Sequence, residues 1–192
     1  MASATAGKPK AADRIQSAAK ELFYRQGIRA TGVEEVCRVA DATKMSLYRT
    51  YPSKDALVAA VLCDDAACYD EWFAEVTRGA TDAAGKLRAL IAAIAERLQV
   101  PDYRGCPMLL AQAEFPDPTH PTHRLVAEFK GRARASIAGL AGEAGAADPE
   151  LLADTLAMLM DGAWATLSYL GGARAAEVLR NAAERALRDA LE

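Results

Sequence analysis

Signatures of membrane and secreted proteins are missing from this sequence of 192 residues. Although 52% of the residues are hydrophobic, no run approaches the roughly eighteen uncharged apolar residues that a membrane span requires. The first ten residues include two lysines, but no apolar stretch follows them, so they do not form a secretory signal. We therefore expect a cytoplasmic protein without a membrane partner and with a short disordered arm over residues 1–10.

Motifs of catalysis and metal binding are also missing. The sequence has no nucleophile elbow and no glycine-rich phosphate loop, and its only two histidines, His120 and His123, lie in a proline-rich segment. The His-x-x-His spacing leaves a metal site open as a minor alternative, but no cysteine or carboxylate accompanies it at a fixed spacing. An enzyme is thus the rival class, and we expect no catalytic residue, no metal and no cofactor.

The four cysteines form no Cys-x-x-Cys pair and no spacing that suits zinc. In a reducing compartment we expect free thiols, with Cys37, Cys63 and Cys68 mostly buried as small apolar side chains. Cys106 falls at the expected start of a helix, where the helix dipole lowers the pKa of a thiol. A structural role is expected for Cys106, and sensing of oxidants or electrophiles is the alternative; we also expect it to be the thiol most prone to alkylation.

Alternating runs of β-branched residues are lacking, whereas apolar residues recur at helical spacing nearly everywhere. We therefore predict an all-α protein with about nine helices. The first has a buried stripe from Ile15 to Phe23 and ends at Gly27. Caps and prolines indicate the others, over about 33–40 (cap Thr31), 44–50 (cap Thr43), 53–76 (cap Ser53), 82–98 (cap Asp82 or Thr81), 108–115, 121–140, 148–167 (cap Asp148) and 175–191.

Charge is distributed unevenly along the chain, whose formal net charge is −3. Up to Lys54 there are ten basic and five acidic residues, a balance of +5, and the remainder carries −8. A basic N-terminal part on an acidic body suggests a polyanion as partner of the N-terminal part alone.

Two short helices joined by a tight turn, between an entering and a leaving helix, make a helix-turn-helix. The second helix of such a unit enters the DNA major groove with its N-terminal side chains. Leu47 is expected to face the core, and the outward residues are Lys44, Met45, Ser46, Tyr48 and Arg49. Lys44 and Arg49 suit phosphates or guanine edges, Ser46 suits either base type and Met45 suits a thymine methyl group. Taken singly, each side chain is more often just solvated or packed.

The run from Gly27 to Val36 and the run Lys44-Met45-Ser46-Leu47-Tyr48-Arg49-Thr50-Tyr51-Pro52-Ser53-Lys54-Asp55-Ala56-Leu57 resemble the DNA-binding signature of the TetR (tetracycline-repressor) family. The resemblance covers about residues 13–62. It implies DNA contacts by Thr31, Lys44, Ser46, Tyr48 and Lys54, and a backbone or base-edge contact by Tyr51. Asp41 replaces the usual turn glycine and Gly32 replaces a common polar residue; Asp41 can still adopt the left-handed conformation.

The resemblance also implies a regulator, by default a repressor, with two domains. Residues 11–54 would bind a double-stranded palindromic operator, and residues 55–192 would sense an unknown small-molecule effector and form a homodimer through the last two helices. A body that only binds another protein is the alternative, and a large apolar pocket would favour the sensor. The expected pocket residues, which could also be plain core, are Tyr69, Trp72, Phe73, Met108, Gln112, Phe115, Met158, Met160, Asp161, Trp164 and Tyr169, with His120 as a further polar group.

Overall fold

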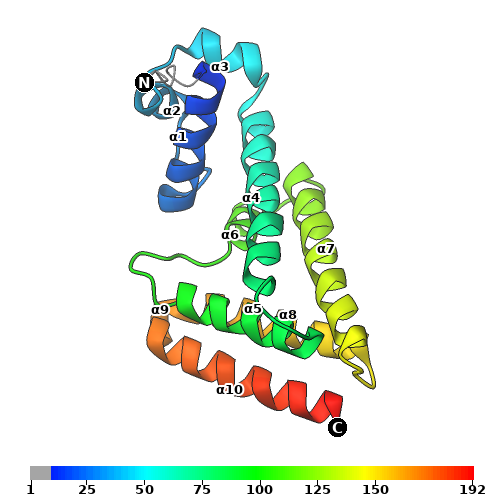
Figure 1. Cartoon of the computed structure of the whole chain (residues 1–192). Helices are drawn as coiled ribbons and strands as arrows, with labels where there is room; N and C mark the ends of the chain where they lie inside the picture. Colours follow the sequence, from blue (N-terminus) through cyan, green and yellow to red (C-terminus); the bar gives the residue numbers. More distant parts are fainter. Residues whose placement is uncertain (1–9) are drawn as a thin grey trace, which may run out of the picture.

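The computed structural model describes residues 10–192, and over this range the chain forms ten helices and no strand (Figure 1). They are α1 (Ala11–Gln26), α2 (Val33–Val39), α3 (Lys44–Thr50), α4 (Lys54–Thr77), α5 (Ala83–Arg97), α6 (Pro107–Ala113), α7 (Pro121–Glu143), α8 (Pro149–Ala165), α9 (Leu167–Leu170) and α10 (Gly172–Leu191). The predicted all-α class is confirmed. The helix beyond the expected nine is α9, whose single turn is too short to show periodicity. None of the helices in the described range is long and apolar enough to cross a membrane.

The expected N-terminal arm lies mostly outside the described residues, which begin at Lys10. Lys10 itself precedes the first turn of α1 as its N-cap residue. Residues 1–9 of the predicted arm thus lie outside the part of the chain that the structure describes.

Side-chain caps fix the beginnings of several helices. Thr43 accepts a hydrogen bond from the Ser46 amide at 3.1 Å, and Ser53 accepts one from the Ala56 amide at 3.0 Å. Asp82 and Asp148 cap α5 and α8 in the same way. These predicted caps are confirmed, and each typically contributes about 1 kcal/mol. The predicted cap at Thr31 is wrong, because Gly32 is the N-cap residue of α2 and the Thr31 hydroxyl donates instead to the Gly27 carbonyl at 2.7 Å.

The helices form a small N-terminal unit, α1–α3, that is connected by the long helix α4 to a larger body (Figure 1). The apolar core of the N-terminal unit does not stop at the unit's edge. It continues through Val58 and Leu62 of α4, Met108 and Ala111 of α6, and Phe129 of α7. The N-terminal unit is thus packed directly on two elements of the body, α4 and α6.

A second apolar core joins α5, α7, α8 and α10. Helix α10 begins in close contact with the end of α5, because a Cβ at Gly172 would lie 2.1 Å from the Leu98 carbonyl oxygen. Any side chain at this position would separate the two helices. On the outside of this layer, five large apolar side chains are exposed, Leu151 and Met158 of α8, Tyr169 and Leu170 of α9, and Val178 of α10. Met158 and Tyr169, which were expected in a pocket, are therefore surface residues, 75% and 73% exposed.

Candidate functional site

The turn between α2 and α3 depends on Asp41, which adopts a left-handed conformation with a φ of 47°. Asp41 replaces a glycine here because its short polar side chain tolerates this region. The Arg14 guanidinium of α1 donates to the carbonyl oxygens of Ala40 and Asp41 at 2.9 and 2.7 Å. These bonds hold the turn against α1 and thereby fix the angle at which α3 leaves the unit.

Helix α3 presents one polar face to solvent and buries the other. Leu47 is fully buried, whereas Met45 is 82% and Tyr48 47% exposed. Lys44 and Arg49 are also exposed, and Ser46 is half-buried beside the Thr43 hydroxyl. The five side chains expected to face outward are therefore arranged on the accessible part of α3, in the geometry that a recognition helix needs.

Two residues expected at a DNA surface are buried instead. Thr31 is 0% exposed and bonded to Gly27, and Tyr51 is 8% exposed with its hydroxyl donating to Gln16 Oε1 at 3.0 Å. Burial also raises the pKa of Tyr51. In this conformation the two side chains fix α1 against α2 and α3, and their contact with DNA stays a prediction. Lys54 is half-buried at the start of α4.

Lys44 carries a contact that the sequence did not predict. Its ammonium group forms a surface ion pair with Glu34 of α2. Hydrogen bonding to Lys44 holds the pKa of the Glu34 carboxyl below its usual value, and the same bond raises the pKa of Lys44. A phosphate or base that binds Lys44 must therefore compete with Glu34.

A cavity of about 280 Å³ lies in the body between α4, α5, α6, α7 and α8. Six of the twelve predicted pocket residues belong to its lining, namely Tyr69, Trp72, Met108, Met160, Asp161 and Trp164. Residues that were not predicted complete it, among them Lys20, Arg97, Tyr103, Cys106, Phe129, Lys130 and Arg134. The lining is thus mostly aromatic and aliphatic with a few charged groups, as is usual for small-molecule sites.

The remaining expected pocket residues have other roles. Phe73 packs against the second core, and Gln112 contacts His123 Nδ1 at 3.3 Å. Phe115 stacks on His120 with ring centroids 3.9 Å apart, and His123 Nε2 lies 2.7 Å from the Phe115 carbonyl oxygen. The two histidines therefore organise the connection between α6 and α7. Among the described residues no group of three or more metal-binding side chains comes together.

Charged groups of the cavity are mostly paired. Lys130 binds Asp161 at 2.6 Å, and Lys20 binds Asp65 at 2.9 Å. Burial alone would lower the pKa of Lys20, but hydrogen bonds to Asp64 and Asp65 outweigh it and raise the pKa. Arg97 lies over the Trp72 ring at 4.5 Å. The indole Nε1 of Trp164 is buried, and within the described part of the chain it makes no hydrogen bond of good geometry, although it interacts with the nearby Tyr103 hydroxyl.

Comparison with known proteins identifies the N-terminal unit and the whole architecture. Residues 15–61 match the model of the bacterial regulatory proteins of the tetR family. A solved structure of a TetR-family transcriptional regulator from Streptomyces coelicolor is 30% identical, superposes with a TM-score of 0.90, and is matched over 95% of this chain and 96% of that one. The chain belongs to the TetR family.

A curated relative agrees with this assignment. The HTH-type transcriptional regulator YjdC of Escherichia coli is 29% identical over 145 residues, which are 75% of this chain and 76% of that protein. The TetR-family chain is therefore a transcriptional regulator that binds DNA through its N-terminal helix-turn-helix.

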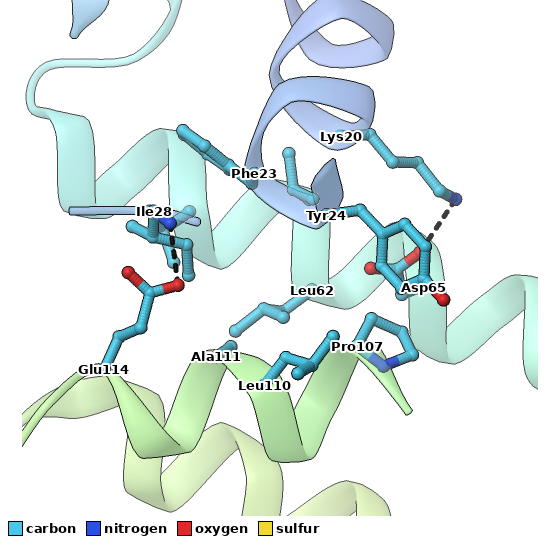
Figure 2. A pocket seen from close by; sticks show the side chains of 12 residues that line it. Lys20, Phe23, Tyr24, Ile28, Leu62, Asp65, Pro107, Leu110, Ala111 and Glu114 are labelled. Atoms are coloured by element: carbon cyan, nitrogen blue, oxygen red, sulfur yellow. Dashed lines mark hydrogen bonds and ion pairs between the residues drawn. The ribbon is translucent and has the colours of Figure 1, made fainter. Parts of the chain in front are cut away.

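The α1–α3 unit of this TetR-family regulator is held to the body by Glu114, at the end of α6. Its two carboxylate oxygens accept hydrogen bonds from the backbone amides of Ile28 and Arg29, each at 2.7 Å. Figure 2 shows Glu114 pointing up from α6 to the chain that follows α1. The sequence analysis missed this residue, since a glutamate 86 positions from its partner leaves no local signal.

Arg104, in the connection between α5 and α6, holds the same end of α1. Its guanidinium donates to the carbonyl oxygens of Tyr24 and Arg25 at 2.5 and 2.8 Å. The next residue, Gly105, has a φ of +95° and passes so close to Trp164 that a Cβ there would lie 3.2 Å from the Trp164 Cβ. The connection between α5 and α6 therefore lines the cavity and also holds the end of α1 by hydrogen bonds.

The cysteine predictions were partly wrong. Cys37 is buried, but Cys63 and Cys68 are exposed on α4. Cys106 is the N-cap residue of α6, as expected, yet it is only 7% exposed, and burial raises rather than lowers the pKa of its thiol. Desolvation outweighs the helix dipole because the thiol faces the apolar lining of the cavity.

In a brief treatment with iodoacetamide, we expect Cys63 and Cys68 to be alkylated first and Cys37 and Cys106 to lag by at least about tenfold, because burial blocks access and disfavours the thiolate. Peptide mass spectrometry gives the four rates, and labelling in guanidinium chloride is the control in which all four should react. Fast labelling of Cys106 in the folded protein would restore its role as a sensing thiol.

Proposed function

We propose that this TetR-family protein acts in the cytoplasm as a repressor, whose homodimer binds a palindromic operator and is released by a small-molecule effector. The observation that carries the proposal is the position of the cavity. Tyr103 and Cys106 line it, and they belong to the connection whose Arg104 holds the end of α1. A ligand that moves this connection acts directly on the DNA-binding unit.

Helix α4 provides a second route for the same signal. Its 24 residues span about 36 Å from Lys54, beside the recognition helix, to the end that carries Trp72 of the cavity. A ligand against Trp72 tilts α4 and changes the separation of the two recognition helices in the dimer. Because that separation has to match about 34 Å along the DNA, a shift of a few ångströms disfavours the bound state.

On the DNA, we assign the contacts to the accessible side chains Lys44, Met45, Ser46, Tyr48, Arg49 and Lys54. In the dimer, we assign the interface to α8 and α10, where Leu151, Met158 and Val178 are exposed. Large apolar side chains at such exposure favour an interface. We propose a DNA-binding part, 11–54, and a sensing and dimerising part, 55–192. This division is one of function and not of packing, because the first apolar core includes residues of both parts.

The rival proposal, a body that only binds another protein, predicts a solid interior. A cavity of about 280 Å³ with both tryptophans of the chain in its lining favours the sensor. Lining residues from six helices, α1 and α4 to α8, also make the cavity responsive to how these helices are arranged.

The experiment that tests the proposal selects bound fragments from random double-stranded DNA and then screens small molecules for release of the selected site. We expect an inverted repeat, bound by a dimer in sedimentation analysis. Failure to bind any selected DNA at low salt would overturn the proposal.

A variant then tests the route through α4. Trp72→Ala should leave operator affinity within about threefold of the wild type but reduce the response to the effector by at least about tenfold, because it removes a cavity wall and no DNA contact. Phe73→Leu, the neighbouring aromatic outside the cavity, is the matched control and should respond normally. If Trp72→Ala loses operator binding while keeping full effector affinity, Trp72 is part of the scaffold rather than the sensor.

A further inference from the structure

The proposed function leaves the chemistry of the effector open, and the polar groups of the cavity narrow it. The indole Nε1 of Trp164 is buried and makes no hydrogen bond of good geometry among residues 10–192, although the Tyr103 hydroxyl is near enough to interact with it. An indole nitrogen only donates, and a buried donor without an acceptor is unfavourable. A ligand that supplies an acceptor at this point removes that unfavourable state, so the wall at Trp164 is suited to a carbonyl, carboxylate or ether oxygen.

The balance of charge in the lining indicates the sign of the ligand. Asp65 and Asp161 are its two carboxylates, and each is already bound by a lysine, Lys20 or Lys130. Of the other two cations, Arg134 is bound to Glu150 and Asp154 outside the lining. Arg97 is left, and no carboxylate pairs with it in the described range. The Arg97 side chain is exposed to solvent and also lines the cavity, so one guanidinium without a carboxylate partner is available to one negative charge there.

The remaining surface indicates the shape of the ligand. The aromatic residues Tyr69, Trp72, Phe129 and Trp164 belong to the lining, and the Arg97 guanidinium lies 4.5 Å from the centroid of the Trp72 ring. Burial raises the pKa of Tyr69 and of Tyr103 to about 12, so both phenols are neutral at physiological pH and do not repel an anion. A volume of about 280 Å³ lies at the low end for small-molecule sites, which favours one or two fused rings.

We propose that the cavity binds a flat aromatic monocarboxylate, with its ring system between Trp72 and Trp164, its carboxylate on Arg97 and an oxygen facing Trp164 Nε1. The proposal rests on the proposed function, because it names the class of effector for the same cavity. The proposal also implies that neutral and cationic aromatic compounds of equal size bind more weakly than the anion.

The test uses the purified full-length protein and three probes, 1-naphthoate, its neutral analogue 1-naphthamide, and the non-aromatic cyclohexanecarboxylate. Trp72 and Trp164 are the two tryptophans of the chain and both line the cavity, so intrinsic fluorescence reports on this site alone. We expect 1-naphthoate to bind at least about tenfold more tightly than 1-naphthamide, the difference that one charge-assisted hydrogen bond produces. It should also bind more tightly than cyclohexanecarboxylate, which carries the same charge but lacks the aromatic rings.

Two variants separate the two polar contacts. Arg97→Gln should abolish the preference of 1-naphthoate over 1-naphthamide, whereas Trp164→Phe should weaken both probes about equally, with Trp72 as the remaining reporter. Arg88→Gln is the matched control, because it removes an arginine from the same helix, α5, outside the lining. It should leave both affinities unchanged.

Three results would each overturn the assignment. They are equal affinities for 1-naphthoate and 1-naphthamide, a preference for 1-naphthoate that survives in Arg97→Gln, and no binding of 1-naphthoate at about 1 mM. Operator binding, measured by gel shift on the selected site, is independent of these probes. If 1-naphthoate shows no such preference but the operator is still bound, only this inference is overturned. If the operator is not bound, the proposed function is overturned.

Discussion

Replacing Tyr48 or Lys54 with alanine is expected to weaken binding to all DNA sequences alike, by about tenfold or more, whereas Ser46→Ala should also relax the preference for one base. Tyr48 is exposed near the middle of α3 and Lys54 lies at the start of α4, and we propose that both side chains contact the sugar-phosphate backbone. Backbone contacts carry no sequence information, unlike contacts to base edges. Lys54→Ala should also reduce the slope of log affinity against log salt by about one.

Lys44 requires a different variant, since its ammonium group is shared with Glu34. Glu34→Gln should free Lys44 and remove a negative charge beside the DNA, so operator affinity should rise by roughly threefold at low salt and less at high salt. Glu35→Gln is the matched control, because it removes the same charge from the same helix without freeing Lys44.

Gel shifts on the selected operator and on scrambled DNA, over a range of salt, measure all of these variants. If Ser46→Ala leaves the base preference unchanged, α3 does not take part in direct readout of base edges. Equal gains in Glu34→Gln and Glu35→Gln would mean that net charge, and not release of Lys44, sets the affinity.

The helices and their caps could be predicted because their causes are local. Thr43, Ser53 and Asp148 each bond an amide three residues ahead, and an apolar stripe needs only the sequence of one helix. Asp41 could be placed in the left-handed turn for the same reason. The outward residues of α3 follow from the single buried side chain Leu47, which fixes the rotation of a seven-residue helix.

Burial by other elements could not be predicted in this way. Thr31 and Tyr51 were assigned to DNA through the family resemblance, which gives positions but not the contacts that Gly27 and Gln16 make with them. The position of Cys106 at a helix start was visible from the sequence, but its burial in the lining of the cavity was not. Arg104 and Glu114 form hydrogen bonds with residues 79 or more positions away in the sequence, and Arg97 lies in the last turn of α5. Sequence spacing gives no signal for such contacts.

Replacing Glu114 with alanine is expected to lower the free energy of unfolding and to disconnect the DNA-binding unit from the cavity. The variant leaves the amides of Ile28 and Arg29 without the carboxylate that accepts from both at 2.7 Å. Ile28 is 5% exposed, so water replaces that bond only in part. Hydrogen bonds to a charged group contribute about 1.5–3 kcal/mol when buried; at this half-buried site we expect a total loss of about 2 kcal/mol.

The effect on regulation follows from the position of the clamp. Glu114 and Arg104 join the end of α1 to the elements beside the cavity, so a change in the cavity moves α1 only while these bonds hold. Without Glu114, the effector-induced change in operator affinity should shrink by about tenfold, which corresponds to a typical coupling free energy between two sites. Operator affinity without effector should change much less, because α3 itself is untouched.

Three measurements separate stability from coupling. Urea denaturation gives the loss of stability, gel shifts with and without effector give the coupling, and hydrogen exchange should accelerate at the amides of Ile28 and Arg29. Glu114→Gln, which keeps one acceptor, should be intermediate in all three. Glu128→Ala is the control, since it removes only an exposed carboxylate paired with Arg124 within α7. If Glu114→Ala loses stability but keeps full effector response, the signal passes through α4 alone and the clamp only anchors α1.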